Sequence, residues 1–247
     1  MEERVKQLID RVKRKKPCES AFREALEWTR GKTYEEILWE CPSYWRLWLL
    51  RKGFHEFAEH CDWEELNGYN WSNLLISQPQ YAELCDWKKL DGYDWIILLK
   101  FRPQFAKYCD WRKLDGSEWA LLLSFQPRLA EFCDWGKLRG SDWAELLSRQ
   151  PQFESQFAEH CDWGKLDGYD WSNLLISQPQ FAEHCDWKRL GGYDWSKLLI
   201  FQPQFAEFCD WEKLDEDDWD GLLEAQPQFK KYRLQGVHDG EKGKTTH

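Results

Sequence analysis

A 24-residue unit recurs seven times in this chain and constrains its fold more than any other feature. The unit reads C-D-W-x-K-L-D-G-x-D-W-x-x-L-L-x-x-Q-P-Q-F-A-E-x, and the copies run from residue 61 to residue 229, with the last one cut short. They begin at Cys61, Cys85, Cys109, Cys133, Cys161, Cys185 and Cys209. Tandem units of this size cannot bury a core alone, so they are expected to stack on one another as a solenoid.

Apolar residues within the unit follow the period of an α-helix. Trp71, Leu74 and Leu75 stand at positions i, i+3 and i+4, and every copy repeats this spacing. Val and Thr are absent from all copies, and the strand motif L-x-x-L-x-L of the rival leucine-rich β-solenoid does not occur. Because proline follows, a second, shorter helix is expected from Pro79 to Cys85. Each copy is therefore predicted to contain two short helices and one tight turn.

Short polar residues indicate where these elements begin. Ser117 and Ser141 directly follow Gly and are expected to act as N-caps, with Glu118 or Asp142 in the first turn. The equivalent acids in other copies are Asp94, Asp170, Asp194 and Asp218. A further Asp follows each Cys and is expected to cap the single turn, although an acidic ladder for cations is the alternative. That column holds Asp62, Asp86, Asp110, Asp134, Asp162, Asp186 and Asp210.

These patterns predict an all-α fold, a right-handed-type α-solenoid of seven short two-helix repeats with a helical N-terminal cap. The cap comprises residues 1–60, the solenoid residues 61–229, and a polar tail expected to be disordered residues 230–247. One interval is longer by four residues, about one helical turn. This insertion, near residues 153–157, predicts a local kink in the array.

The N-terminal cap is expected to contain four helices. Ser20 is expected to cap the second, and Thr33 with Glu36 has the spacing of a capping box. The fourth is rich in Trp and is expected to cover the first repeat. The expected ranges are Glu2–Lys15, Ser20–Arg30, Thr33–Glu40 and Tyr44–Arg51.

Nine cysteines in a chain without an apolar N-terminal segment predict free thiols in a reducing, cytoplasmic setting. No C-x-x-C spacing occurs, so neither a metal site nor a cofactor is expected. Each repeat Cys is interpreted as a small buried hydrophobe at a contact between repeats.

Catalysis needs unlike groups at one place, whereas a repeat supplies the same groups at every place. In three copies a His precedes the Cys, but neighbouring residues of a helix point about 100° apart. These histidines, interpreted as surface residues, are His60, His160 and His184. No catalytic residue is therefore predicted. The minority enzyme alternative would place a site around Cys18, Cys41 and His55.

Charge is unevenly distributed along the chain. Residues 61–229 contain 16 basic and 31 acidic residues, a net charge of −15, whereas residues 1–60 carry +2 and residues 230–247 carry +3. An array this acidic repels phosphates and attracts basic protein surfaces. Direct nucleic-acid binding is not expected. Membrane association is not expected either, because no apolar run approaches the roughly 18 residues of a membrane helix.

Three columns of the unit vary between copies, whereas Trp, Leu-Leu, Pro and Asp recur. The simpler interpretation is that the varying columns are surface positions under no structural or functional constraint. Tyr, Phe and Arg are common anchors of protein interfaces, however, so our hypothesis is that the Tyr column lines a concave face that contacts a protein. The candidate partner-binding residues are Tyr69, Tyr93, Tyr169, Tyr193, Ile97, Phe101, Leu121, Phe125, Arg149, Lys197 and Phe201.

The pattern F-A-x-x-C-D-W-x-K-L-D-G-x-D-W-x-x-L-L-x-x-Q-P-Q resembles Trp-rich repeats found in tandem in uncharacterised bacterial proteins. The resemblance covers about residues 54–229, and the segment from Trp39 to Trp48 is similar to a Trp-rich leader of such chains. It implies a bacterial or phage-related origin and brings no known activity.

The sequence thus predicts a cytoplasmic, non-enzymatic repeat scaffold that binds a protein or peptide through its repeat surface. The alternative is an acidic inhibitor or immunity-type protein that neutralises a basic target, such as a nuclease, by mimicking nucleic acid. The two differ in salt dependence, because charge mimicry weakens steeply with ionic strength and aromatic anchoring does not.

Overall fold

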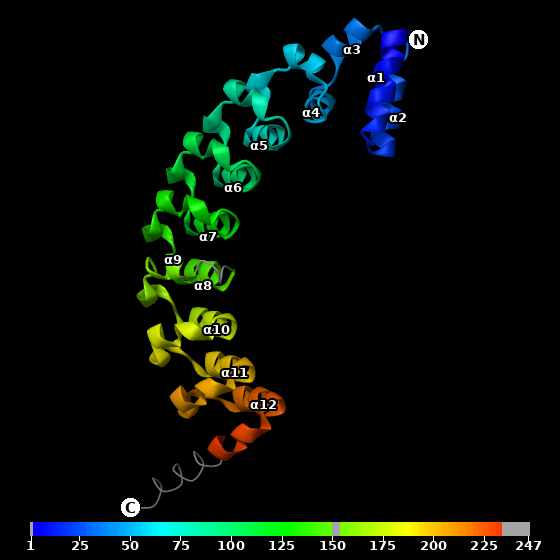
Figure 1. Cartoon of the computed structure of the whole chain (residues 1–247). Helices are drawn as coiled ribbons and strands as arrows, with labels where there is room; N and C mark the ends of the chain where they lie inside the picture. Colours follow the sequence, from blue (N-terminus) through cyan, green and yellow to red (C-terminus); the bar gives the residue numbers. More distant parts are fainter. Residues whose placement is uncertain (1, 150–153, 234–247) are drawn as a thin grey trace, which may run out of the picture. The chain divides into compact units, whose positions relative to one another are not determined.

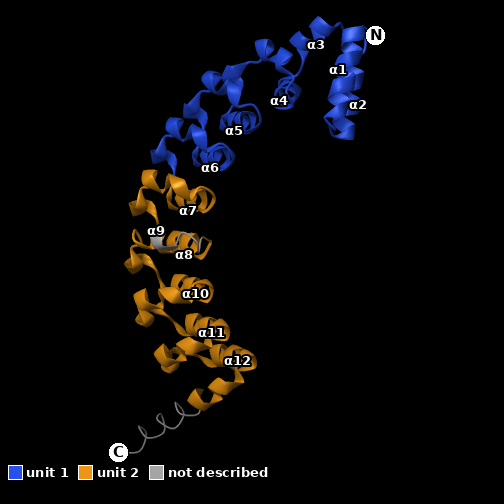
Figure 2. Cartoon of the chain, in the orientation of Figure 1, with its two compact units in different colours: residues 1–114 blue, residues 115–247 orange. Residues whose placement is uncertain are grey.

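The computed structural model of the protein describes residues 2–149 and 154–233. Within these ranges every regular element is helical and no strand occurs. The chain divides into two compact units, Met1–Leu114 and Asp115–His247, drawn in blue and orange in Figure 2. Within each unit the 24-residue repeats pack on one another in chain order, so the predicted all-α solenoid is confirmed.

Four α-helices precede the first repeat. The predicted capping box at the third is present, since Thr33 Oγ1 accepts a hydrogen bond from Glu36 N at 3.2 Å and Thr33 N donates to Glu36 Oε2 at 2.7 Å. The fourth packs on the first repeat helix, as predicted. The predicted Ser20 cap is wrong, because the second helix already begins at Glu19 and Cys18 holds the cap position without a capping bond. The four helices are α1 (Glu3–Arg14), α2 (Glu19–Trp28), α3 (Tyr34–Glu40) and α4 (Ser43–Arg51) (Figure 1).

A typical repeat consists of a three-residue 3₁₀ turn, a ten-residue α-helix and a six-residue 3₁₀ segment that begins at proline. The predicted second helix is thus 3₁₀ rather than α, a form common in short pieces. The first unit contains η1 (His55–His60), η2 (Trp63–Glu65), α5 (Gly68–Ser77), η3 (Pro79–Leu84), η4 (Trp87–Lys89), α6 (Gly92–Phe101), η5 (Pro103–Tyr108) and η6 (Trp111–Lys113).

The second unit repeats the same order of elements. In Figure 1 helices α7, α8, α10, α11 and α12 form one row, and the 3₁₀ segments form another together with α9. Its elements are α7 (Gly116–Phe125), η7 (Pro127–Phe132), η8 (Trp135–Lys137), α8 (Gly140–Arg149), α9 (Glu154–Ala158), η10 (Trp163–Lys165), α10 (Gly168–Ser177), η11 (Pro179–His184), η12 (Trp187–Arg189), α11 (Gly192–Phe201), η13 (Pro203–Phe208), η14 (Trp211–Lys213), α12 (Glu216–Ala225) and η15 (Pro227–Phe229).

The four inserted residues fall in the fourth copy, where α9 takes the place of the 3₁₀ segment. Phe157 of this helix is buried like the equivalent Phe181 and Phe205. The kink predicted over residues 153–157 includes Phe153, which lies outside the described residues. The prediction that the tail over residues 230–247 is disordered is wrong for residues 230–233, which are helical and stack Tyr232 on Trp211 with ring centroids 4.4 Å apart, while residues 234–247 lie outside the described residues.

The repeat helices begin earlier than the sequence analysis expected, so the predicted Ser117 and Ser141 caps are wrong. Helix α7 starts at Gly116, and Asp115 Oδ1 accepts a hydrogen bond from Glu118 N at 2.8 Å. Glu118 Oε2 accepts one from Asp115 N at 2.9 Å, which completes a capping box. Ser141 lies inside α8 in the same way. The motif D-G-x-D therefore supplies both halves of the box, and the other side-chain N-caps are Asn67, Asp91, Asp167 and Asp215.

The Asp after each Cys caps its short turn in most copies, as predicted. It accepts a hydrogen bond from the backbone N two residues later at 3.2–3.3 Å, whereas Asp134 and Asp210 make no such capping bond. The capping members are Asp62, Asp86, Asp110, Asp162 and Asp186.

The core of each repeat is a pair of stacked tryptophans beside two leucines. Trp171, Leu174 and Leu175 are completely buried. Trp163 from the preceding turn stacks on Trp171 with ring centroids 5.6 Å apart. Indoles bury large areas at fixed geometry, so this pair sets the packing of the short helices, which would be unstable alone.

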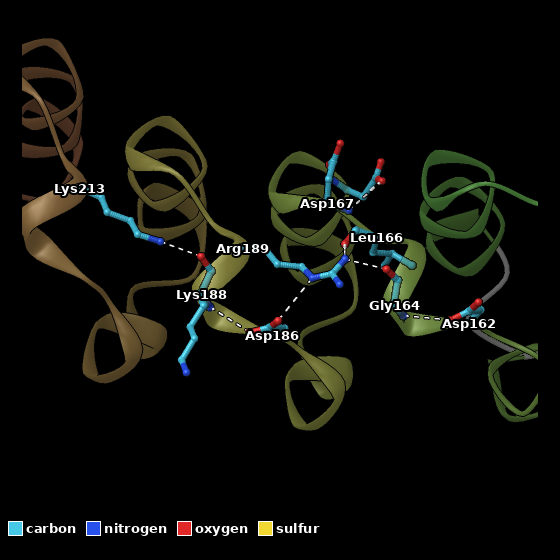
Figure 3. A network of polar contacts seen from close by, with 9 residues as sticks. Asp162, Gly164, Leu166, Asp167, Asp186, Lys188, Arg189 and Lys213 are labelled. Atoms are coloured by element: carbon cyan, nitrogen blue, oxygen red, sulfur yellow. Dashed lines mark hydrogen bonds and ion pairs between the residues drawn. The ribbon is translucent and has the colours of Figure 1, made fainter.

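A cationic side chain in each turn fastens one repeat to the one before it. Arg189 Nη1 donates hydrogen bonds to the carbonyl oxygens of Gly164 and Leu166, both at 2.7 Å (Figure 3). Equivalent bonds are made by Lys89, Lys113, Lys165 and Lys213. The first copy, which no copy precedes, carries Glu65 at this position.

A glycine at the start of each repeat helix allows the next repeat to approach. A Cβ on Gly168 would lie 2.4 Å from Asp194 Oδ2 and 2.5 Å from the carbonyl oxygen of Arg189, closer than real atoms come. In the last copy Glu216 replaces the Gly and is exposed, because no copy follows it in the sequence. The first and last copies thus differ from the others at positions that contact an adjoining copy elsewhere in the array.

Candidate partner-binding surface

The three variable columns lie on one face of each repeat helix. In α5 they are Tyr69, Asn73 and Ser77, at positions i, i+4 and i+8, which share a helix face. The buried Trp71, with its Leu pair, occupies the opposite face. We call the second, sixth and tenth residues of α5, α6, α7, α8, α10, α11 and α12 the variable stripe.

In the first unit the variable stripe is formed by the adjacent helices α5 and α6. Tyr69 is 63% exposed and Tyr93 58%. Their hydroxyl groups make no hydrogen bond within the described part of the unit. Phe101, at the end of α6, is exposed as well, whereas Ile97 between them is partly buried. Three large rings therefore face solvent from two packed helices.

In the second unit the columns of neighbouring helices contact one another. Lys197 Nζ of α11 donates a hydrogen bond to Asn173 Oδ1 of α10 at 2.7 Å and lies 4.7 Å from the ring centroid of Tyr169. Tyr193 and Phe201 of α11 are 62% and 61% exposed. These residues, placed in one column each by sequence, form a continuous surface across α10 and α11.

The remaining candidates on α7 and α8 are less open. Leu121 is partly buried, and Phe125 is 38% exposed. Arg149 is exposed but pairs with Glu145 at 2.9 Å, one helical turn away. Within the variable stripe, the most exposed aromatic rings thus lie on α5, α6, α10 and α11.

The repeat cysteines are half-buried rather than fully buried. Burial raises the pKa of the Cys61 thiol to about 11 and that of Cys109 or Cys185 to about 12. A thiol with such a pKa stays protonated at neutral pH and is a weak nucleophile and metal ligand. Among the described residues no group of three His, Cys, Asp or Glu side chains is placed to hold a metal ion.

The histidines before the Cys are stacked on Trp, a role that sequence reasoning missed. His184 lies on Trp163 with ring centroids 4.4 Å apart, and His160 lies on Trp135 at 4.5 Å. The same column holds Tyr108 and Phe208, which stack on Trp in the same way. Its signal in the sequence is that planar side chains fill the column in all but one copy.

Of the three residues of the enzyme alternative, Cys18 and Cys41 line one apolar cavity between the N-terminal helices, but His55 is not part of its lining. Cys18 Sγ lies 3.2 Å from Ser20 Oγ, and His55 Nδ1 lies 2.7 Å from the Tyr81 hydroxyl. Cys41 is buried, and burial raises the pKa of its thiol to about 12. In the described part of the chain no hydrogen bond joins any two of these three residues.

Comparisons with protein-family models, with curated proteins and with solved structures each found no match to this chain. The resemblance to bacterial Trp-rich repeats therefore stays a prediction. Among the described residues, no helix is both long and apolar enough to cross a membrane.

Proposed function

We propose that the protein is a non-enzymatic scaffold that binds a protein or peptide through the variable stripe. The observation that carries the proposal is the set of exposed rings on neighbouring helices, above all Tyr69 with Tyr93 and Tyr193 with Phe201. Clustered exposed aromatic side chains are typical of interfaces, because they bury large areas with little loss of rotamer freedom.

The internal contacts of the repeats support this proposal. The stack is held by the Trp pair, the Leu pair, the close-approach Gly and the cation that bonds to the preceding repeat. None of these contacts uses the second or tenth residue of α6 or α11. Packing therefore gives no reason for Tyr93 or Phe201, whereas a partner would. The nine free thiols support a reducing, cytoplasmic setting for that partner.

A second candidate is the acidic inhibitor that neutralises a basic target such as a nuclease. It is supported by the net charge of −15 over residues 61–229 and by the acidic start of α12, where Glu216 and Asp217 are exposed. A basic partner would gain from this field at low ionic strength.

Affinity capture from the native host, followed by identification of the partner and measurement of its Kd, tests both candidates. The double variants Tyr69→Ala/Tyr93→Ala and Tyr193→Ala/Phe201→Ala are expected to weaken binding at least about tenfold, as loss of anchor residues does. Glu83→Ala and Glu207→Ala, exposed in the same repeats but outside the variable stripe, are the matched controls. An unchanged Kd in both double variants would refute binding through the variable stripe.

The salt dependence of the Kd distinguishes the two candidate functions. For aromatic anchoring, raising the salt from 50 to 500 mM is expected to change Kd little. A loss of affinity of about a hundredfold or more would favour the acidic inhibitor, because screening removes long-range charge attraction.

A further inference from the structure

An apolar cavity lies between the N-terminal helices of the first unit. Its volume is about 340 Å³, it is partly open to solvent, and α1, α2 and α4 supply most of its wall. Trp28, Trp45 and Trp48 contribute three indole rings, and among the described residues that line it only Glu24 carries a charge. Pockets for small molecules usually have this size and an apolar lining of this kind.

A second hollow, of about 360 Å³, lies where α1 and α4 end. Three of its lining residues, Arg11, Arg14 and Lys15, come from the end of α1, and Lys52 directly follows α4. Arg11 pairs with Glu56 at 2.7 Å, but Lys15 and Lys52 form no ion pair with any residue in the described part of the chain. The surplus of positive charge in this hollow would attract an anion.

The two hollows are neighbours on the same two helices. On α1, Val12 lines the apolar cavity, while Arg11 and Lys15, one and three residues away, line the basic hollow. Lys52 Nζ lies 5.7 Å from the ring centroid of Trp48, whose indole lines the apolar cavity. An apolar chamber thus adjoins a cationic rim.

The described part of the protein leaves the apolar face of α2 only partly covered. Ala21, Phe22 and Ala25 all line the cavity and are only partly buried, and α2 has no fully buried residue. An apolar chain placed in the cavity would remove these side chains from water. An apolar peptide segment would do the same but would not use the cationic rim.

We propose that this site binds a linear fatty carboxylate. The chain lies in the cavity walled by Trp28, Trp45 and Trp48, and the carboxylate pairs with Lys15 and Lys52. The site lies in the N-terminal helices and is separate from the variable stripe, so it does not depend on the function proposed above.

Calorimetric titration of the full-length protein with hexanoate, octanoate and decanoate, and with decanol, tests the proposal. Affinity is expected to rise about fourfold per methylene until the cavity is full, from the free energy of burying each CH₂. Decanoate is expected to bind at least tenfold more tightly than decanol. Affinity that does not depend on chain length, or no heat with any of these compounds, would overturn the proposal.

Two kinds of variant test the two halves of the site. Lys15→Gln/Lys52→Gln is expected to lower the affinity for decanoate to that for decanol, whereas Lys6→Gln/Lys13→Gln, an equal charge change at exposed positions of α1 outside both hollows, leaves both affinities unchanged. Ala25→Trp fills the cavity and is expected to abolish binding of both ligands. If that variant has lost helix content by circular dichroism, Ala21→Phe is the substitute. Equal effects of the rim variant and Lys6→Gln/Lys13→Gln, or full binding by a folded cavity-filling variant, would refute the site.

Discussion

The N-terminal helices and the repeats use tryptophan in different ways. In the repeats, Trp71, Trp171 and their equivalents are completely buried, apart from Trp219 of the last copy, which is 7% exposed, and they stack on a second Trp at 5.4–5.6 Å. In the N-terminal helices, Trp39 is 71% exposed, and the other three line a cavity. A Trp that recurs together with its neighbours makes the same packing contacts in each copy. A Trp that occurs outside the repeats depends on unique neighbours, and at α2 the described residues cover it only in part.

The largest expected effect is that of removing a buried repeat Trp. Trp171→Ala is expected to lower the free energy of unfolding by about 3–5 kcal/mol, because it leaves a large cavity and removes a stacking partner of Trp163. Trp28→Ala, at the half-open wall of α2, is expected to cost less than about 1.5 kcal/mol. Urea denaturation of both variants measures the difference. Equal losses would contradict the contrast between the two regions.

Thiol reactivity is expected to distinguish the same two regions. Hydrogen bonds, chiefly from the Ser20 side chain, lower the pKa of the exposed Cys18 thiol below its usual value, whereas burial raises that of Cys185 to about 12. At pH 8 Cys18 is expected to react with iodoacetamide at least roughly 30-fold faster, after allowing for the lower intrinsic nucleophilicity of a more acidic thiol. Peptide mass spectrometry over time measures both rates. Similar rates would show that the repeats shield their thiols no better than the N-terminal helices do.

A smaller effect is expected at the glycine where two repeats touch. Gly168→Ala places a Cβ against the Arg189 carbonyl oxygen and is expected to cost about 1–3 kcal/mol, the usual result of overpacking. Gly221→Ala in α12 meets no atom within 4 Å and is expected to stabilise the helix by up to about 1 kcal/mol. Thermal unfolding shows whether each substitution stabilises or destabilises the protein. Stabilisation by both substitutions would refute close approach between repeats.

The smallest effect is expected at the buried capping-box carboxylate. Burial raises the pKa of Asp170 in the folded protein, so the charged form is disfavoured there. A raised folded-state pKa contributes stability that is fully present below the unfolded-state pKa and is lost as pH rises through the folded-state value. Asp170→Asn, the residue type found at Asn70 of the first copy, is therefore expected to stabilise slightly at pH 7 and to have no effect at pH 3. If Asp170→Asn instead destabilises the protein, and does so more as the pH rises, the expected direction of the effect is contradicted.

The periodic part of the fold could be predicted because each local sequence signal, which is unreliable when it occurs once, is repeated seven times. The spacing of Trp71, Leu74 and Leu75 indicated a helix, and these residues form the core. The cap of Thr33 also followed from spacing alone. The starts of the repeat helices were misplaced because Asp115 and Ser117 are both good N-cap residues, and only the packed structure shows which one occupies the cap.

Contacts between repeats were harder to predict because they join residues about 24 positions apart. The sequence shows that a Lys or Arg recurs at the position of Arg189. Glu65, which stands there in the first copy, was the only indication that this position contacts the preceding repeat. The variable stripe was proposed column by column, but its three columns fall on one face only because the helix places positions i, i+4 and i+8 together. The cavity beside Trp28, Trp45 and Trp48 left no periodic signal, since each of its wall residues occurs once.

Hydrogen–deuterium exchange of α2 and α10, two ten-residue helices, tests most directly whether the repeats complete their own packing while the N-terminal helices do not. Amides of α10 are expected to exchange at least about tenfold more slowly than those of α2, because α10 buries Trp171 and its Leu pair and α2 buries no residue completely. Equal protection of the two helices would contradict the account.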